Sequence, residues 1–196
     1  MQPDVEQALR NLTLAPYIVK AMALIGIRRR GGSNMFRHQL STLAILMDYK
    51  VLDPLLLKAA VIHDLFEDAA GLPGVTEKEI VPLDADGPAV FALVMEVTRR
   101  VVNGQKEPKP DYLRRVMTTG SARARQLKLA DRISNLTALG FVNDPEFVNR
   151  YVEETRTWIL PHARQVNADM FRELSDLVES RGAGGGRAGT LGPPQR

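Results

Sequence analysis

Hydrophobic residues recur along most of the chain three and four residues apart, which is the spacing of one face of an α-helix. The most apolar stretch, residues 51–62, is interrupted only by Asp53 and Lys58. Asp53 followed by Pro54 is typical of a helix start, and Gly71 is typical of a helix end. A helix that is apolar on nearly every side is a buried helix. The pattern therefore predicts one buried helix that starts at Asp53 and continues into the polar residues before Gly71.

The rest of the chain also has helical periodicity. Helices are predicted over residues 4–12, 17–27, 36–49, 87–102 and 121–139, with a long final helix from 144 to about 181. Pro161 should kink that final helix. Short helices should follow the capping-box pattern at Thr76 and the capping residue Asp111. No convincing pair of strands is visible. We therefore predict an all-α fold in which residues 1–181 form a single domain and the glycine- and proline-rich residues 182–196 form a disordered tail.

The composition fits one soluble globular domain and excludes several classes of protein. The chain has 196 residues, of which 44% are hydrophobic and 25% charged, and this is enough for one sizeable core. The absence of cysteine excludes disulfides, zinc fingers and thiol catalysis, and it suits a reducing, cytoplasmic setting. No secretory signal and no apolar run of membrane-spanning length is visible, so we expect no membrane partner. The net charge of +3 weakly favours anionic small molecules, with nucleic acid as only one option.

Four polar side chains at the end of the predicted buried helix are candidates for chemistry. His63 and Glu67 are four residues apart, as are Asp64 and Asp68, so each pair shares one side of a helix. Unpaired buried carboxylates are costly, so such a cluster needs a cation, a partner charge or access to water. An adjacent His and Asp can offer nitrogen and oxygen ligands to a divalent metal. The alternative is that the helix end reaches the surface and its polar side chains are merely solvated.

Further polar segments could line the same site. Residues 28–34 form a basic, glycine-bearing loop whose arginines match phosphate oxygens, although a solvated surface turn would have the same composition. Lys128, Asp131 and Asn135 can all address one side of their helix. Residues 103–110 form a polar loop, which we expect to be a mobile cover. By itself, His38 in the first turn of its helix is more often a structural residue than a ligand.

Together these residues resemble the HD superfamily of metal-dependent phosphohydrolases, and more closely its RelA/SpoT-type hydrolase branch. The order of metal ligands in that superfamily is matched by His38, His63, Asp64 and Asp131. Residues 63–68, HDLFED, resemble the HDxxED box of the branch, and residues 128–135, KLADRISN, resemble its KLADRxxN box. The resemblance spans roughly residues 14–140 and implies a helical HD-domain fold.

The resemblance implies a metal site and a pair of catalytic residues. A single Mn²⁺, or alternatively Fe²⁺ or Zn²⁺, would be held by His38, His63, Asp64 and Asp131. The metal would lower the pKa of a bound water and polarise the phosphoryl oxygens. Glu67 and Asp68 match the family's catalytic carboxylates, which would position that water and move protons.

The resemblance also implies substrate contacts. Arg29, nine residues before His38, matches a nucleotide-contacting arginine of the family. Asn135 would hydrogen-bond the ribose or its 3′-phosphate. Lys128 is a further candidate on the substrate side, and it would either orient Asp131 or be structural.

The implied activity is removal of the 3′-diphosphate from the alarmones ppGpp and pppGpp by a small stand-alone enzyme. One alternative is an HD phosphohydrolase for another nucleotide, such as a deoxynucleotide or NADPH. Another is a non-catalytic helical protein that binds nucleotides or nucleic acid, although a pure binder needs no open metal site. The chain departs from the family at Gln39, where the family has proline, and at residues 34–37, which lack its tyrosine. Because the resemblance implies that this loop shapes the nucleotide pocket, the sequence does not determine which nucleotide is the substrate. It does not determine the oligomeric state either.

Overall fold

The computed structural model describes residues 3–183. Its α-helices are α1 (Pro3–Arg10), α2 (Ala15–Ala21), α3 (Met35–Asp48), α4 (Pro54–Ile62), α5 (Leu65–Asp68), α6 (Glu77–Ile80), α7 (Gly87–Val97), α8 (Lys109–Thr119), α9 (Ala122–Ala138), α10 (Pro145–Trp158), α11 (Leu160–Val166) and α12 (Ala168–Ala183). Short 3₁₀ helices are η1 (Met22–Leu24), η2 (Val81–Leu83) and η3 (Leu139–Phe141). The all-α prediction is confirmed, with the addition of a small hairpin of β1 (Val101–Val102) and β2 (Gln105–Lys106). Of the tail predicted over 182–196, residues 182 and 183 belong to α12, and the rest lies outside the described residues.

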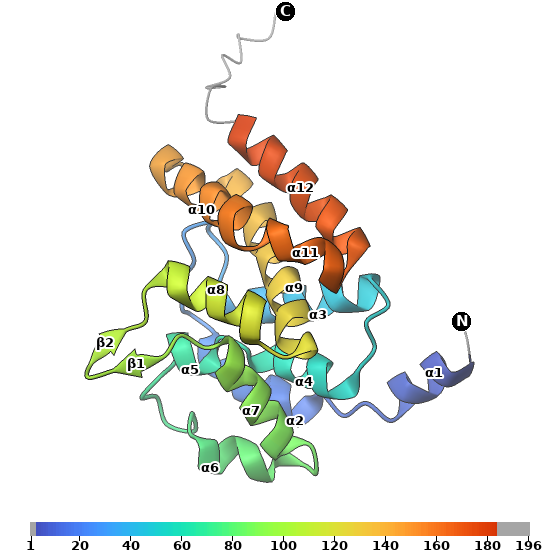
Figure 1. The fold of residues 1–196 in the computed structure, drawn as a ribbon. Coiled ribbons are helices and arrows are strands. Elements are labelled where there is room, and N and C mark those ends of the chain that lie inside the picture. The colour runs from blue at the N-terminus through green and yellow to red at the C-terminus, as the bar shows by residue number, and fades with distance from the viewer. Residues whose placement is uncertain (1–2, 184–196) are drawn as a thin grey trace, which may run out of the picture.

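Helix α9 runs through the middle of the fold (Figure 1). It packs against α3, α7, α8 and α12, while α4 packs against α2, α3 and α7. Every residue of α4 from Leu56 to Ile62 is buried, which confirms the predicted buried helix. Within the described residues, no helix combines the length and the hydropathy needed to cross a membrane. Because α3, the end of α4 and α9 meet inside the fold, side chains from three distant parts of the sequence converge there.

The predicted continuation of the buried helix through residues 63–70 is wrong. The helix stops before Asp64, whose backbone (φ −97°, ψ 1°) leaves the helical region. At this break, Nδ1 of His63 donates to the carbonyl of Ala60 at 2.8 Å, and the amide of Asp64 donates to Gln39 Oε1 at 3.3 Å. Side-chain hydrogen bonds of this kind compete with those of a continuing helix. The chain therefore turns at the point where its polar residues begin.

The helix predicted over 87–102 is also shorter than expected, because it ends at Val97. The chain then forms the β1–β2 hairpin, which projects at the left of Figure 1. Its turn is made by Asn103 (φ 51°) and Gly104 (φ 76°). Asn-Gly is the favoured dipeptide of a two-residue hairpin turn, because both positions require positive φ. The sequence thus contained the signal for this hairpin, and the prediction of no strand pair was wrong.

The long final helix is in fact three helices, α10, α11 and α12. Asn167 has an extended backbone (φ −157°, ψ 115°), and its Oδ1 accepts hydrogen bonds from the amides of Asp169 and Met170, both at 3.0 Å. An asparagine that caps a new helix in this way ends the previous one. Pro161 lies in the first turn of α11, where a proline is tolerated because its missing N–H has no helical partner. The prediction of one kinked helix is therefore wrong.

Smaller differences concern how other helices begin and end. The side chain of Thr76 makes no capping hydrogen bond, so the capping-box interpretation is wrong although α6 does start at the next residue. Helix α8 begins two residues before Asp111, after Pro108. Residues 22–24 of the helix predicted over 17–27 form η1. None of these differences moves a candidate site residue to another part of the fold.

Candidate active site

The four predicted metal ligands meet where α3, the turn between α4 and α5, and α9 come together. One ligand atom from each of His38, His63, Asp64 and Asp131 lies within 4.8 Å of the other three. His38 Nε2 is 3.0 Å from Asp131 Oδ1 and 3.3 Å from Asp64 Oδ2, and His63 Nε2 is 3.2 Å from the same Asp64 oxygen. Ligand atoms about 2.1 Å from one ion and at right angles to each other are about 3 Å apart. The spacing of the cluster therefore fits a divalent cation.

The ring orientations of both histidines are set by their other nitrogens. His63 Nδ1 donates to the carbonyl of Ala60, which leaves the lone pair on Nε2 facing the carboxylates. Among the described residues, this buried Nε2 makes no well-aligned hydrogen bond, and Asp64 Oδ2 at 3.2 Å is the carboxylate oxygen nearest to it. His38 Nδ1 lies 2.8 Å from the hydroxyl of Ser134. A buried nitrogen without a well-aligned hydrogen bond is costly, and a cation between it and the carboxylates would satisfy it.

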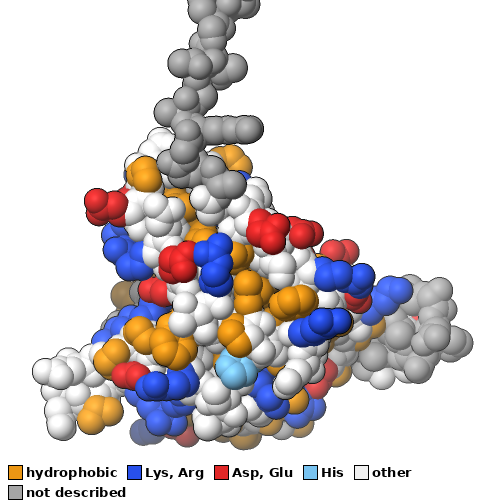
Figure 2. Space-filling view, turned by 45° about the horizontal axis from the view of Figure 1, so that its top comes forward, with side chains coloured by type: hydrophobic (Ala, Val, Ile, Leu, Met, Phe, Trp, Pro, Cys, Tyr) orange, Lys and Arg blue, Asp and Glu red, His pale blue; other side chains and the backbone are white. Residues whose placement is uncertain are grey.

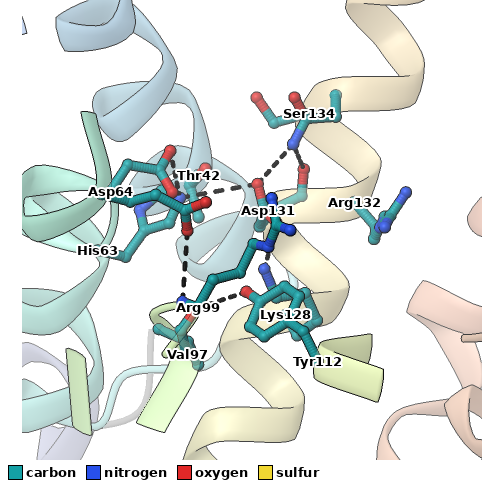
Figure 3. A network of polar contacts seen from close by, with 12 residues as sticks. Thr42, His63, Asp64, Val97, Arg99, Tyr112, Lys128, Asp131, Arg132 and Ser134 are labelled. Carbon is teal, nitrogen blue, oxygen red and sulfur yellow. Dashed lines mark hydrogen bonds and ion pairs between the residues drawn. The ribbon is translucent and has the colours of Figure 1, made fainter. Parts of the chain in front are cut away.

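Asp131 is held by its neighbours on α9. Its Oδ2 accepts a hydrogen bond from Lys128 Nζ at 2.8 Å, and its Oδ1 accepts one from Asn135 Nδ2 at 2.5 Å. Figure 3 shows Lys128, Asp131 and Ser134 on α9, facing His63 and Asp64 across the site. Lys128 is only 5% exposed. Its burial and its bond to Asp131 favour the orienting role over a direct contact with substrate.

The charges in the cluster depend on one another. Burial by itself would raise the pKa of Asp131, but Lys128 and the histidines hold that pKa well below its usual range. Asp64 is affected in the same way, and its pKa is lowered chiefly by His63 and His38 against the effect of burial. Burial would lower the pKa of His63, yet Asp64 and Asp131 raise it to about 10. Without a cation the cluster therefore keeps a proton, which a bound metal would have to displace.

The two predicted catalytic carboxylates lie on α5, next to the ligand cluster but outside it. Glu67 Oε1 is 2.9 Å from Lys106 Nζ on β2, and Glu67 Oε2 is 3.5 Å from the amide nitrogen of Arg99. Burial, followed by the charges of Asp64 and Glu67, raises the pKa of Asp68 to about 6. Part of the Asp68 side chain is exposed, so solvent weakens this effect. Asp68 is thus able to exchange a proton near neutral pH.

One cavity of about 200 Å³ brings most of the predicted site residues together. Its lining includes Arg29, His38, Asp64, Glu67, Asp68, Lys128, Asp131 and Asn135. Arg29 reaches it from the 28–34 loop, and its guanidinium donates to Asn135 Oδ1. The remaining predicted residue, His63, is not among the described residues that line this cavity, but it belongs to the ligand cluster beside it.

Sequence reasoning assigned no role to several cationic and aromatic residues on the same cavity, although it left open whether Arg99 and Arg100 contact the substrate. The additional lining residues include Arg99, Lys109, Tyr112, Arg132 and Tyr151. Arg132 is 2% exposed, and its guanidinium carbon lies 4.2 Å from the centroid of the Tyr151 ring. Lys109 Nζ is 4.9 Å from the same ring, and burial beside Arg132 lowers the pKa of Lys109. Arg132 belongs to the KLADRISN box and could have been singled out. Lys109 and Tyr112 share one side of α8, whereas Arg99 follows α7 and Tyr151 lies on α10, so no single local pattern connects the whole group.

A second, more open pocket of about 900 Å³ adjoins the first and shares Arg29 and His38 with it. It lies between the 28–34 loop, α3, α9 and α12, and neither Glu67 nor Asp68 is among the described residues that line it. The smaller cavity is therefore the one that combines ligands, carboxylates and cations.

Comparison with known proteins shows similarity over nearly the whole chain. No family model matches the sequence. The chain is 33% identical over 184 residues to the GTP pyrophosphokinase rsh of Brucella ovis and of Brucella abortus, and 31% identical over 183 residues to that of Brucella melitensis. Each alignment covers 90% of this chain and 23% of the relative, so the chain spans about a quarter of the length of these curated relatives.

A solved structure has the same fold. It is that of a metazoan ortholog of SpoT, a protein that hydrolyzes ppGpp and plays a role in starvation responses. It matches with a TM-score of 0.68 at 23% identity, over 93% of this chain and 97% of that chain. The predicted helical HD-domain fold is thereby confirmed. Its two motif boxes and its fold agree with the resemblance to the RelA/SpoT-type branch of the HD superfamily, and its sequence relatives agree with that resemblance as well.

Proposed function

We propose that the chain is a metal-dependent phosphohydrolase that removes the 3′-diphosphate of ppGpp and pppGpp. One observation carries the proposal: two imidazoles and two carboxylates converge beside further carboxylates and a group of cations that line one cavity. Such a set can bind a divalent ion, an attacking water and a polyphosphate at the same time. The reported ppGpp hydrolysis by the metazoan relative with the same fold supports the choice of substrate.

We propose Mn²⁺ as the ion, with Fe²⁺ and Zn²⁺ as alternatives, because it suits mixed imidazole and carboxylate ligands with room for water. Its ligands would be His38, His63, Asp64 and Asp131. When bound, the ion supplies Lewis-acid polarisation of a phosphoryl oxygen and lowers the pKa of a water. The hydrogen bond from His63 Nδ1 to Ala60 keeps the tautomer that such a ligand requires.

The residues of α5 would perform the proton transfers. Glu67, held by Lys106, would orient the attacking water and accept its proton while the phosphorus–oxygen bond to the ribose 3′ oxygen breaks. Asp68, whose pKa is near 6, would exchange a proton with the leaving group or with solvent. Proton transfer by positioned side chains accelerates reactions by about 10²–10⁴-fold. These two carboxylates would therefore account for much of the turnover without binding the metal.

Arg29 and Asn135 would bind the substrate. The guanidinium of Arg29 would offset phosphate charge, and it is already held against the cavity by Asn135 Oδ1. Asn135 would hydrogen-bond the ribose or its 3′-phosphate. Lys128 would keep Asp131 oriented.

A panel of substrates tests the proposed activity. The protein would be assayed with Mn²⁺, and after removal of metal, on ppGpp, pppGpp, NADPH, a deoxynucleoside triphosphate and several nucleoside monophosphates. We expect metal-dependent release of pyrophosphate from ppGpp and pppGpp at the highest kcat/KM. Faster turnover of NADPH or of the deoxynucleotide would show that the substrate is wrong. Tight nucleotide binding without any turnover would favour the non-catalytic alternative.

The surface gives no support to nucleic acid as a ligand on the face drawn in Figure 2. Lys and Arg side chains on that face are interspersed with Asp and Glu. A protein that binds nucleic acid presents a continuous basic patch or stripe instead. The charges on this face therefore favour a small nucleotide over nucleic acid.

Arg29→Ala should raise KM for ppGpp at least tenfold. Charge-assisted hydrogen bonds contribute about 1.5–3 kcal/mol, and about 1.4 kcal/mol corresponds to a factor of ten. A phosphate monoester should be affected less, because it presents fewer phosphate oxygens. Steady-state kinetics on both substrates would measure the difference.

The two flanking arginines serve unequally as controls for that variant. Arg28 is exposed, and Arg28→Ala should behave like the parent. Arg30 Nη1 lies 3.0 Å from Asp144 Oδ2, and its guanidinium carbon lies 4.5 Å from the centroid of the Phe147 ring, so Arg30→Ala would also remove these contacts. If both Arg29→Ala and Arg28→Ala hydrolyse every substrate as well as the parent does, the loop is only a surface turn.

Asp68→Asn should stabilise the metal-free protein near neutral pH but not in acid. The folded-state pKa of Asp68 is raised from 3.8 to about 6, so the folded state binds its proton more tightly than the unfolded state does. Ionisation of Asp68 therefore costs stability as the pH rises through about 6, and the asparagine variant avoids that cost. Urea unfolding in the presence of a chelator, at about pH 4 and about pH 7.5, would measure the difference in the free energy of unfolding between the variant and the parent. Glu77→Gln, at an exposed position of α6, is the control, and an equal effect of Asp68→Asn at both pH values would contradict the assignment.

A further inference from the structure

Gln39 is a buried polar residue directly after the metal-ligand candidate His38. It is fully buried, with 0% of its surface exposed. Both atoms of its side-chain amide are directed at Asp64. Nε2 donates to Asp64 Oδ2 at 3.1 Å, and Oε1 accepts a hydrogen bond from the backbone amide of Asp64 at 3.3 Å.

The carboxylate oxygen that Gln39 holds is the one that faces the histidines. Asp64 Oδ2 lies 3.3 Å from His38 Nε2 and 3.2 Å from His63 Nε2. The hydrogen bond from Gln39 therefore restricts the rotation of the Asp64 carboxylate and keeps Oδ2 where it would bind a cation. Hydrogen bonds from neighbours to ligating carboxylates orient the ligands of most metal sites.

The same side chain holds the backbone of Asp64 at the point where α4 ends. The amide of Asp64 has its acceptor in Gln39 Oε1, and this contact lies at the break that separates α4 from α5. One side chain on α3 thus holds both the main chain and the carboxylate of a residue that is distant in sequence.

We propose that Gln39 is a positioning residue for Asp64 and that it sets the affinity of this site for a divalent ion. The inference rests on the metal site of the proposed function, but not on the identity of the nucleotide. Loss of a neighbour that orients a metal ligand typically costs about 10–100-fold in metal affinity. A purely structural glutamine would leave the metal affinity unchanged once the protein is folded.

The test is a titration of the full chain with Mn²⁺ in the absence of any nucleotide. Electron paramagnetic resonance or calorimetry would measure the bound Mn²⁺. Gln39→Met keeps the size of the side chain but removes both hydrogen bonds. We expect it to weaken Mn²⁺ binding by about 10–100-fold. At saturating Mn²⁺ it should retain most of its kcat, because Glu67 and Asp68 are untouched.

Thr42→Val is the matched control. Thr42 is also buried on α3, and its hydroxyl bonds only the main-chain carbonyl of His38 among its contacts in the structure. This variant loses a buried hydrogen bond without losing a contact to Asp64, so its Mn²⁺ affinity should match that of the parent. If Gln39→Met does not fold, Gln39→Asn takes its place. Asparagine keeps a neutral amide but is one methylene shorter, so it cannot keep both contacts with Asp64, and it too should weaken Mn²⁺ binding.

The outcomes separate this inference from the proposed function. Mn²⁺ affinity within twofold of the parent in a folded Gln39 variant would overturn the inference even if the parent hydrolyses ppGpp. A parent that binds none of Mn²⁺, Fe²⁺ and Zn²⁺ would overturn it as well. Mn²⁺ binding that depends on Gln39 in a protein without activity on any nucleotide would support the inference and reject the proposed function.

Discussion

Asp131→Asn should abolish tight Mn²⁺ binding and nearly all phosphohydrolase activity, while the helices stay folded. Asp131 lies at the centre of the site, where its Oδ1 is 3.0 Å from His38 Nε2 and its Oδ2 accepts from Lys128. An asparagine lacks the negative charge that draws a cation to this position, so the set of ligands is incomplete. The packing of α9 depends on its buried apolar residues and should persist.

The choice of asparagine over alanine follows from the burial of Lys128. Its side chain is 6% exposed, and its ammonium is paired with Asp131. Removal of one partner of a buried ion pair typically destabilises a protein by about 3–5 kcal/mol, because it leaves the other charge unpaired. Asp131→Ala should therefore lower the free energy of unfolding as well as metal binding. Asparagine retains an oxygen that can accept from Lys128 and confines the effect more closely to the metal.

Metal content per chain, circular dichroism and urea unfolding would measure these effects. Asp111→Asn is a suitable control, since Asp111 is exposed on α8 and, among the described residues, forms an ion pair only with Arg114. It should leave metal content and activity unchanged. Unchanged metal stoichiometry in Asp131→Asn would reject Asp131 as a ligand.

Glu67→Gln should lower kcat by about 10²–10⁴-fold with little change in metal content or nucleotide Kd. Glutamine has nearly the same shape as glutamate but cannot accept a proton from water. Glu67 lies beside the ligand cluster, and its contacts are with Lys106 and the amide of Arg99. The variant should therefore bind the substrate and fail to turn it over.

Lys106→Met separates the proton-transfer role of Glu67 from its ion pair. The side chain of Lys106 is 43% exposed, so loss of this pair alone should have a small effect on stability. If Lys106→Met lowers kcat as much as Glu67→Gln, then the position of Glu67, rather than its basicity, is the larger factor. A collapse of metal content in Glu67→Gln would instead show that Glu67 is itself a ligand. Single-turnover kinetics and metal analysis on both variants would distinguish these results.

Local spacing explains why much of the site could be predicted from the sequence. Lys128, Asp131 and Asn135 lie three and four residues apart on one helix, and the structure joins all three by hydrogen bonds. Helical geometry places such residues on one side wherever the helix packs. The apolar composition of residues 54–62 likewise required a buried helix, and α4 is buried.

Other features depend on packing between distant segments and could not be predicted in this way. The break at His63 and Asp64 relies on the Gln39 amide, which reaches them from α3. Lys109 and Arg132 meet at the ring of Tyr151 only because α8, α9 and α10 pack together. The sequence marked none of these contacts, since each requires two segments that no short pattern connects.

By itself the sequence determined the helical class of the protein and its buried helix, because hydrophobic periodicity acts within one helix. The candidate ligands, which lie on separate elements, came from the resemblance of its motifs to a known family. Only the tertiary structure decided where those helices break, which cations join the cavity and that Gln39 holds Asp64. The physical reason is that apolar burial drives the helices together without direction. The polar contacts that then form are directional and depend on the final packing.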